Sequence, residues 1–189
     1  MPAAISRKEA SLLRRIRDLL PSGDAGSYLV GGDIRDQLLG RRTRDIDVAV
    51  EGNAIDTARE VAAALQGHFV LLDEAQGIAR VVLSERESAG ESQWHLDFSS
   101  IRGNIESDLS RRDFTIDAMA MKLSDIGKRS APRLIDPFGG RDDLAAGSIR
   151  AVGASVFKDD PARLIRGVRL AAQYDFTIES GTKEMMSRQ

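Results

Sequence analysis

Asp45-Ile46-Asp47 is the tripeptide with the clearest potential for chemistry in this sequence. It opens segment 45–50, where polar and apolar residues alternate at the start with the period of a strand. Because side chains on a strand alternate between faces, Asp45 and Asp47 are expected to point the same way, roughly 6–7 Å apart. Two carboxylates at this spacing can hold a divalent cation between them. An exposed acidic strand face would produce the same pattern.

A third carboxylate, Asp97, lies in another segment with strand character, 94–99. On a strand, the apolar side chains of Leu96 and Phe98 point to the face opposite to Asp97. If this strand neighbours the first one, Asp97 lies beside the aspartate pair and becomes a third acidic group of the site. A solvated strand position explains Asp97 equally well.

The composition limits the kind of metal that these carboxylates could share. The chain has 189 residues, no cysteine and only two histidines, His68 and His95, which excludes thiolate and histidine-rich metal sites. Carboxylate oxygens favour a hard cation such as Mg²⁺. The net charge of −2 is ordinary and does not by itself indicate a nucleic-acid-binding protein.

No segment of the sequence indicates a membrane protein or a secreted one. Apolar runs stay well below the roughly 18 residues of a membrane span, and the N-terminus lacks the layout of a signal peptide. We therefore expect a cytoplasmic protein with no membrane partner. The oligomeric state cannot be predicted from this sequence.

A glycine turn, Gly31-Gly32, lies upstream of the aspartate pair, between an expected strand at 27–31 and a short helix that ends at Gly40. Glycine lets backbone N–H groups approach an anion, and a helix N-terminus favours negative charge. Arg35, about one turn into that helix, could clamp a phosphate. A plain tight turn with a surface arginine would look the same.

Arg111-Arg112-Asp113 places two cations beside a carboxylate. Arginines suit phosphate groups, and a carboxylate suits ribose hydroxyls. The alternative is a solvated charge cluster at a helix start, with Asp113 as the cap.

Asp160-Pro161 has the pattern of an N-cap followed by proline in the first helical position. Arg163, Arg166 and Arg169 then recur every third residue, and with Asp160 they are expected to form the polar side of the helix. The side expected to face the core comprises Leu164, Ile165, Val168, Ala171 and Ala172. The simplest interpretation is the solvated face of an amphipathic helix. If Asp160 caps the helix, its carboxylate is less free to contact a ligand.

Further elements are expected to position these residues. Ile46, Val48 and Val50 should enter the core, and Asn53 should cap a helix. Besides those named above, we expect helices over 6–20, 54–65, 161–174 and mainly over 106–121, and strands over 68–72, 78–84, 119–123 and 133–135. This order predicts an α+β protein with a helical C-terminal end. The chain stops at Gln189 shortly after an expected helix start, which suggests a fragment of a longer protein.

Five blocks in order resemble the class II family of tRNA CCA-adding enzymes and bacterial poly(A) polymerases. They span about residues 27–176 and read LVGGDIRDQLLGRRTRDIDVAV, LDFSSIRG, DLSRRDFTIDAMAM, LIDPFGGRDDL and DDPARLIRGVRLAAQYDF. The resemblance implies a polymerase-beta-like nucleotidyltransferase head with a mixed sheet and flanking helices in residues 1–150, followed by the start of an all-helical neck in residues 151–189.

The resemblance also implies roles. Asp45 and Asp47 would be the catalytic metal ligands and Asp97 the third catalytic acid. The nucleotide-binding positions would be Gly31, Gly32, Arg35, Arg111, Arg112, Asp113, Asp160, Arg163, Arg166 and Arg169. Within that set, Asp160 and Arg163 would hydrogen-bond the Watson–Crick edge of the incoming base, since an aspartate accepts from exocyclic amines and an arginine donates to ring nitrogens and carbonyls.

Three departures from the family pattern bear on its details. The family usually shows Asn at the position of Asp117 and Glu at the position of Asp159. The segment between Asp97 and the double arginine is short, which favours a CC-adding enzyme over one that adds the complete CCA.

The implied activity is template-independent transfer of C residues, A residues or both, from CTP and ATP, to the 3′ end of tRNA, with two Mg²⁺ ions. The RNA 3′-hydroxyl would attack the α-phosphate, and pyrophosphate would leave. Poly(A) polymerase is the nearest alternative. A small-molecule nucleotidyltransferase and a non-catalytic RNA-binding module are more distant ones.

Overall fold

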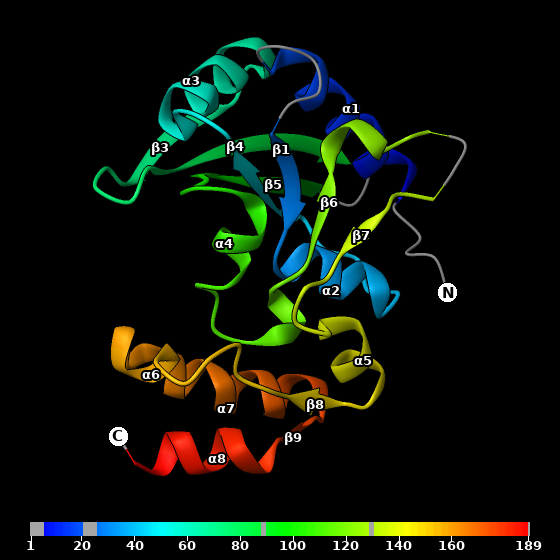
Figure 1. The fold of residues 1–189 in the computed structure, drawn as a ribbon. Coiled ribbons are helices and arrows are strands. Elements are labelled where there is room, and N and C mark those ends of the chain that lie inside the picture. The colour runs from blue at the N-terminus through cyan, green and yellow to red at the C-terminus, as the bar shows by residue number, and fades with distance from the viewer. Residues whose placement is uncertain (1–5, 21–25, 88–89, 129–130, 189) are drawn as a thin grey trace. The chain divides into compact units, whose positions relative to one another are not determined.

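The computed structural model describes residues 6–20, 26–87, 90–128 and 131–188. The chain divides into two compact units (Figure 1). The first comprises Met1–Arg102 and Met121–Arg133, and the second comprises Gly103–Ala120 and Leu134–Gln189. No helix among the described residues is long and apolar enough to cross a membrane. The division of the chain at residue 150 into a head and a neck remains a prediction.

The first unit is built on a mixed sheet with the strand order β3-β4-β5-β2-β1-β6. Strand β2 pairs in parallel with β5, whereas the β1–β2, β3–β4 and β4–β5 pairs are antiparallel. The strands are β1 Ser27–Val30, β2 Asp45–Val50, β3 His68–Asp73, β4 Ile78–Glu87, β5 Gly90–Ser100 and β6 Ala120–Lys122. The mixed sheet with flanking helices confirms the fold class predicted from the sequence.

Helices flank this sheet where the capping residues predict them. Helix α1, Arg7–Leu19, begins at Ser6, which forms a capping box with Glu9. Helix α3, Ala54–Leu65, begins at Asn53, whose side chain accepts from two backbone N–H groups. The remaining helical elements of this unit are α2 Gly32–Leu38 and the 3-10 helix η2 Leu123–Asp125. Ile46, Val48 and Val50 are buried, which confirms the predicted core face of β2.

The second unit is mostly helical at its C-terminal end, as predicted. Its short strands β8 and β9 pair in parallel. In chain order its elements are α4 Ile105–Leu109, η1 Thr115–Asp117, β7 Leu134–Ile135, α5 Gly140–Ala145, β8 Ser148–Ile149, α6 Val156–Asp159, α7 Ala162–Tyr174, β9 Thr177–Ile178 and α8 Ser180–Ser187.

The prediction of a mainly helical segment over 106–121 is wrong. Only α4 and the single 3-10 turn η1 are helical there. Residues 113–120 are buried on all sides, and Phe114 forms a bridge with Ala151. The backbone of this segment pairs with a distant one instead, since Thr115 N–H donates to Arg150 O and Val152 N–H donates to Asp113 O. These backbone groups are therefore satisfied without an α-helix.

The predicted orientation of helix α7 is also wrong. Ile165 and Val168 are 76% and 56% exposed, whereas Gly167, Leu170 and Tyr174 are buried. Gly167 explains the rotation, because a Cβ there would lie 2.7 Å from the ring of Phe114. The absent side chain lets this face of the helix approach the ring closely, and the apolar stripe read from the sequence remains on the surface.

A buried acidic group in the first unit gives a pH-dependent prediction. Burial raises the pKa of Asp33 well above its ordinary 3.8, with a further contribution from the nearby charge of Glu9. Gln37 donates to both carboxylates, and Asp33 Oδ1 has no partner among the described residues. The folded state therefore favours the protonated form, and the stability that this form contributes is lost as the pH rises through the raised pKa.

The variant Asp33→Asn is expected to remove this dependence, because the amide stays neutral. Its free energy of unfolding should exceed that of the original protein more at pH 7 than at pH 4, measured by urea denaturation at both values. Asp18→Asn, at an exposed position of α1, is the matched control. A stability difference for Asp33→Asn that is equal at both pH values would contradict the prediction.

Candidate functional site

The two aspartates of β2 project from the sheet face opposite to the core, as predicted. The buried side chains of Ile46 and Val48 alternate with them along the strand. Asp45 is 74% exposed at its side chain, and Asp47 is half-buried. The β2 carboxylates are thus held by a rigid strand in the interior of the sheet, while their oxygens remain accessible to a ligand.

Strand β5 places Asp97 directly beside the pair. In the parallel ladder, Asp97 is the partner of Asp47, and His95 is the partner of Asp45. The His95 Nδ1 atom lies 2.9 Å from Asp45 Oδ1. The sequence-based expectation that Asp97 lies on a neighbouring strand is therefore met, whereas the contact of His95 was not foreseen.

Arg80 is a member of this face that the sequence analysis missed. It lies on β4 opposite Asp97 and donates through Nε and Nη2 to the two carboxylate oxygens, at 2.6 and 2.7 Å. The available signal was Arg80 itself, a charged residue inside the apolar run from Ile78 to Leu83. Without knowledge of the strand register, that residue could not be assigned to Asp97.

The oxygen atoms on this face suit a hard divalent cation. Among the described residues, no three His, Asp or Glu side chains are arranged to hold a metal by themselves. Mg²⁺ does not require such a cage, because it usually takes one or two carboxylates and completes its shell with water and substrate phosphates. Asp45 and Asp47 fit that requirement.

The glycine turn lies next to the carboxylates. Val30, the last residue of β1, is the ladder partner of Asp47, so Gly31 follows immediately at this edge of the site. Gly31 has φ +73° and ψ −141°, a backbone conformation that residues other than glycine rarely adopt. Arg35 is buried beside Gly32 and forms an ion pair with Asp36 at 3.1 Å.

The second unit holds the Arg111-Arg112-Asp113 cluster. The carboxylates of Asp113 and of the nearby Asp117 both form ion pairs with an arginine of the same unit. Arg166 of α7 contacts Asp113 at 2.9 Å and Asp117 at 3.3 Å. Asp113 is almost completely buried and accepts from the backbone of Phe114 instead of capping a helix. The structure thus gives Arg166 two carboxylate partners within the protein, at a position where the family resemblance implied nucleotide binding.

Asp160 and Arg163 lie at the start of α7. Asp160 Oδ1 accepts from the N–H of Ala162 at 2.9 Å, so the carboxylate is engaged at the helix start as the sequence suggested. Arg163 donates to the backbone carbonyls of Arg111 and Val156, at 3.0 and 3.3 Å. The guanidinium therefore links the two predicted nucleotide-binding segments of this unit.

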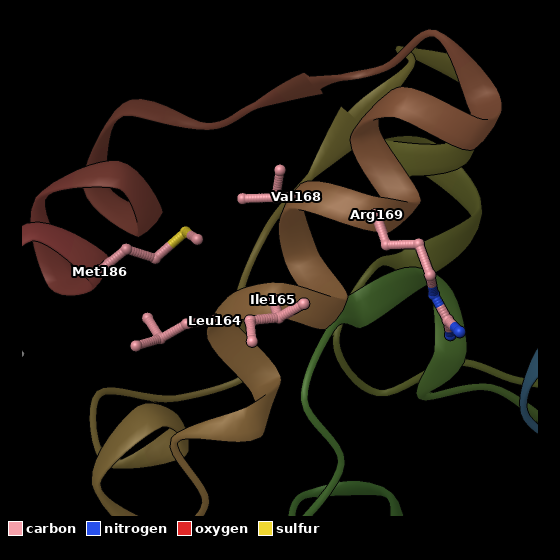
Figure 2. A pocket seen from close by; sticks show the side chains of 5 residues that line it. All are labelled: Leu164, Ile165, Val168, Arg169 and Met186. Atoms are coloured by element: carbon pink, nitrogen blue, oxygen red, sulfur yellow. The ribbon is translucent and has the colours of Figure 1, made fainter.

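Arg169, the last predicted contact of α7, is exposed and borders a groove of about 490 Å³ between α7 and α8. Figure 2 shows Met186 of α8 directed toward Leu164 and Val168, while Arg169 extends away from them. The groove is apolar and open, so it does not resemble a triphosphate site.

The predicted site residues therefore form two sets, one in each unit. The first unit holds Gly31, Gly32, Arg35, Asp45, Asp47 and Asp97, and the second holds Arg111, Arg112, Asp113, Asp160, Arg163, Arg166 and Arg169.

Known proteins share this arrangement of sequence and fold. Residues 27–150 match the family described as the poly A polymerase head domain. The CC-adding tRNA nucleotidyltransferase of Geobacter sulfurreducens is 42% identical over 174 residues, which cover 92% of this chain and 38% of that protein. The A-adding tRNA nucleotidyltransferase of Deinococcus radiodurans is 39% identical over 170 residues, covering 90% of this chain and 36% of that protein.

A solved structure extends the likeness to three dimensions. The Thermotoga maritima CCA-adding enzyme complexed with tRNA aligns with a TM-score of 0.80 and 37% identity, covering 97% of this chain and 42% of that one. The chain thus spans well under half the length of these relatives. Since the family match covers most of the chain and includes β1, β2 and β5, the chain belongs to the poly A polymerase head domain family.

Proposed function

We propose that this chain carries the catalytic head of a template-independent nucleotidyltransferase that adds C or A residues to the 3′ end of tRNA. The observation that carries the proposal is the aspartate pair on β2 with the Gly31 turn at its ladder partner. A carboxylate pair beside an anion-accepting turn is the arrangement that a metal-bound nucleoside triphosphate requires. We infer tRNA as the substrate from the similar proteins, which are named tRNA nucleotidyltransferases.

Within this proposal, each residue set has one task. Asp45 and Asp47 hold Mg²⁺, of which two ions are expected, and the bound metal supplies charge neutralisation at the reacting phosphate and hydroxyl. The N–H groups after Gly31 bind phosphate oxygens, assisted by Arg35. Arg111 and Arg112 contact the ribose and phosphates, and Asp160 with Arg163 selects the base. The resemblance assigns Asp113 to the ribose as well, but its buried carboxylate is held by Arg166. Catalysis by the chain's own residues is then mainly positioning and electrostatic stabilisation.

Which nucleotides are added is a separate proposal. The short segment between Asp97 and Arg111 favours CC addition, while the similar proteins include both CC-adding and A-adding tRNA nucleotidyltransferases. Poly(A) polymerase activity remains the alternative within the same family. We expect the activity in the cytoplasm, where tRNA and nucleoside triphosphates are present.

Substitution of Arg163 tests the base-selecting role. Equilibrium binding of CTP, ATP, GTP and UTP with Mg²⁺ is expected to show preference for CTP or ATP. Arg163→Ala should reduce this preference by about 1–3 kcal/mol, the typical discrimination of one well-placed arginine contact. Weaker binding of all four nucleotides with an unchanged preference would contradict base selection by Arg163.

The control for this experiment addresses the structural contacts of Arg163. Arg141→Ala removes an exposed arginine of the same unit and should leave the preference intact. Arg163→Ala also removes the hydrogen bonds to the carbonyls of Arg111 and Val156. Thermal unfolding of each variant measures how much the loss of these bonds destabilises the fold, so that this effect is distinguished from the loss of a base contact.

A further inference from the structure

Three charged residues form a row across the central strands of the first unit. Arg80 on β4 faces Asp97 on β5, and Asp97 faces Asp47 on β2. Side chains at directly opposite ladder positions project from the same face of a sheet. One permanent positive charge therefore lies at the end of a row that leads to the proposed metal-binding pair.

The contact between Arg80 and Asp97 has two-point geometry. Both carboxylate oxygens accept from the guanidinium, at 2.6 and 2.7 Å, which fixes the orientation as well as the distance of the two groups. The side chains are 35% and 27% exposed. This geometry holds the charge of Arg80 at a fixed place on the acidic face, next to the ladder partner of Asp47.

The charge of Arg80 acts on the whole face. Hydrogen bonding and attraction to Asp97 raise the pKa of its guanidinium, and the charges of Asp45 and Asp47 contribute in the same direction. Attraction between charges is mutual, so Arg80 offsets part of the repulsion among the aspartates on this face. The same charge repels a cation that approaches Asp45 and Asp47.

We propose that Arg80 is a positioning residue that holds Asp97 in a closed ion pair and thereby sets the cation affinity of the site formed by Asp45 and Asp47. This inference rests on the proposed function of the aspartate pair. In it, Asp97 shapes the site through its charge balance with Arg80 and does not itself bind the metal. The pair adds no net charge to the face, but it fixes where each charge lies.

The charge balance predicts opposite effects of two substitutions. Arg80→Met removes a positive charge and should tighten Mn²⁺ binding by roughly threefold to tenfold. Asp97→Asn leaves Arg80 without its partner charge and should weaken Mn²⁺ binding by roughly the same factor. The double variant carries the same net charge on this face as the original protein, so its affinity should lie within about twofold of it.

The double variant separates the proposal from its main competitor. If Asp97 were itself a metal ligand, the double variant would bind Mn²⁺ as weakly as Asp97→Asn does, because the ligand would be missing in both. That result would overturn the inference. Two single variants that change the affinity in the same direction, or by less than twofold, would overturn it as well.

The experiment is a titration of the nucleotide-free protein with Mn²⁺, followed by the electron paramagnetic resonance signal of the free ion. Arg80→Lys keeps the positive charge, so its Mn²⁺ affinity should stay within about twofold of that of the original protein. This variant tests the charge argument if Arg80→Met does not fold. Arg59→Met, which removes an exposed ion pair with Asp56 on α3, should leave the affinity unchanged. Thermal unfolding verifies that each variant is folded.

Two further variants separate this inference from the proposed function. Asp45→Asn and Asp47→Asn should each abolish the specific Mn²⁺ site. Retained Mn²⁺ binding in both would refute the metal-binding pair and, with it, the role of Arg80. Loss of binding in these variants together with unchanged affinity in Arg80→Met would overturn the role of Arg80 alone.

Discussion

Asp47→Asn is expected to lower the rate of nucleotide addition about 10³-fold or more, because one of two proposed metal ligands loses its charge. Asparagine keeps the size of the side chain and can still accept a hydrogen bond, so the β2 strand and its register should persist. Single-turnover extension of a tRNA primer measures the effect. Asp45→Asn should behave in the same way.

A matched control shows whether the loss is local to the site. Asp142→Asn changes an exposed aspartate in the first turn of α5 and should leave the extension rate unchanged. Full activity of either Asp45→Asn or Asp47→Asn would refute the assignment of these residues to the catalytic metal site.

Arg166→Ala is expected to lower the free energy of unfolding by about 2–4 kcal/mol. The substitution leaves the carboxylates of Asp113 and Asp117, which are only 8% and 1% exposed, without their shared cation. The estimate lies at the lower end of values for buried pairs, because Arg166 itself is 46% exposed. Urea denaturation followed by circular dichroism measures the change.

A second substitution should rescue this variant. Asp117→Asn in the Arg166→Ala background removes one of the two buried charges that have lost Arg166 and should recover about 1–2 kcal/mol. Arg169→Ala, on the same helix and without an ion pair among the described residues, should change stability by about 0.5 kcal/mol or less. An equal loss in the Arg166 and Arg169 variants would show that the buried carboxylates do not depend on Arg166.

Local signals predicted the elements that carry the aspartate pair. Alternation placed β2 at Asp45–Val50, and the capping pattern of Asn53 placed α3 at Ala54–Leu65, both with the bounds seen in the structure. These predictions succeed because each depends on residues that are neighbours along the chain. The family resemblance then gave the order of the blocks and the mixed sheet.

Contacts between distant segments could not be predicted in this way. The pairing of Arg80 with Asp97 depends on strand register, and the burial of residues 113–120 depends on the packing of the second unit. Helix α7 shows the same limit, since its apolar stripe lies on the surface while Gly167 faces Phe114. A periodic pattern identifies a helix but does not identify the partner of each face.

The most direct test of the proposed function is nucleotide addition resolved at single-nucleotide length. The protein is incubated with Mg²⁺, one labelled nucleoside triphosphate at a time, and tRNA that lacks its 3′-terminal CCA. We predict incorporation of C or A that stops after a defined short addition, and none on unrelated RNA. A long ladder of A residues on any RNA would instead establish a poly(A) polymerase, and the absence of incorporation from every nucleotide would contradict a catalytic head.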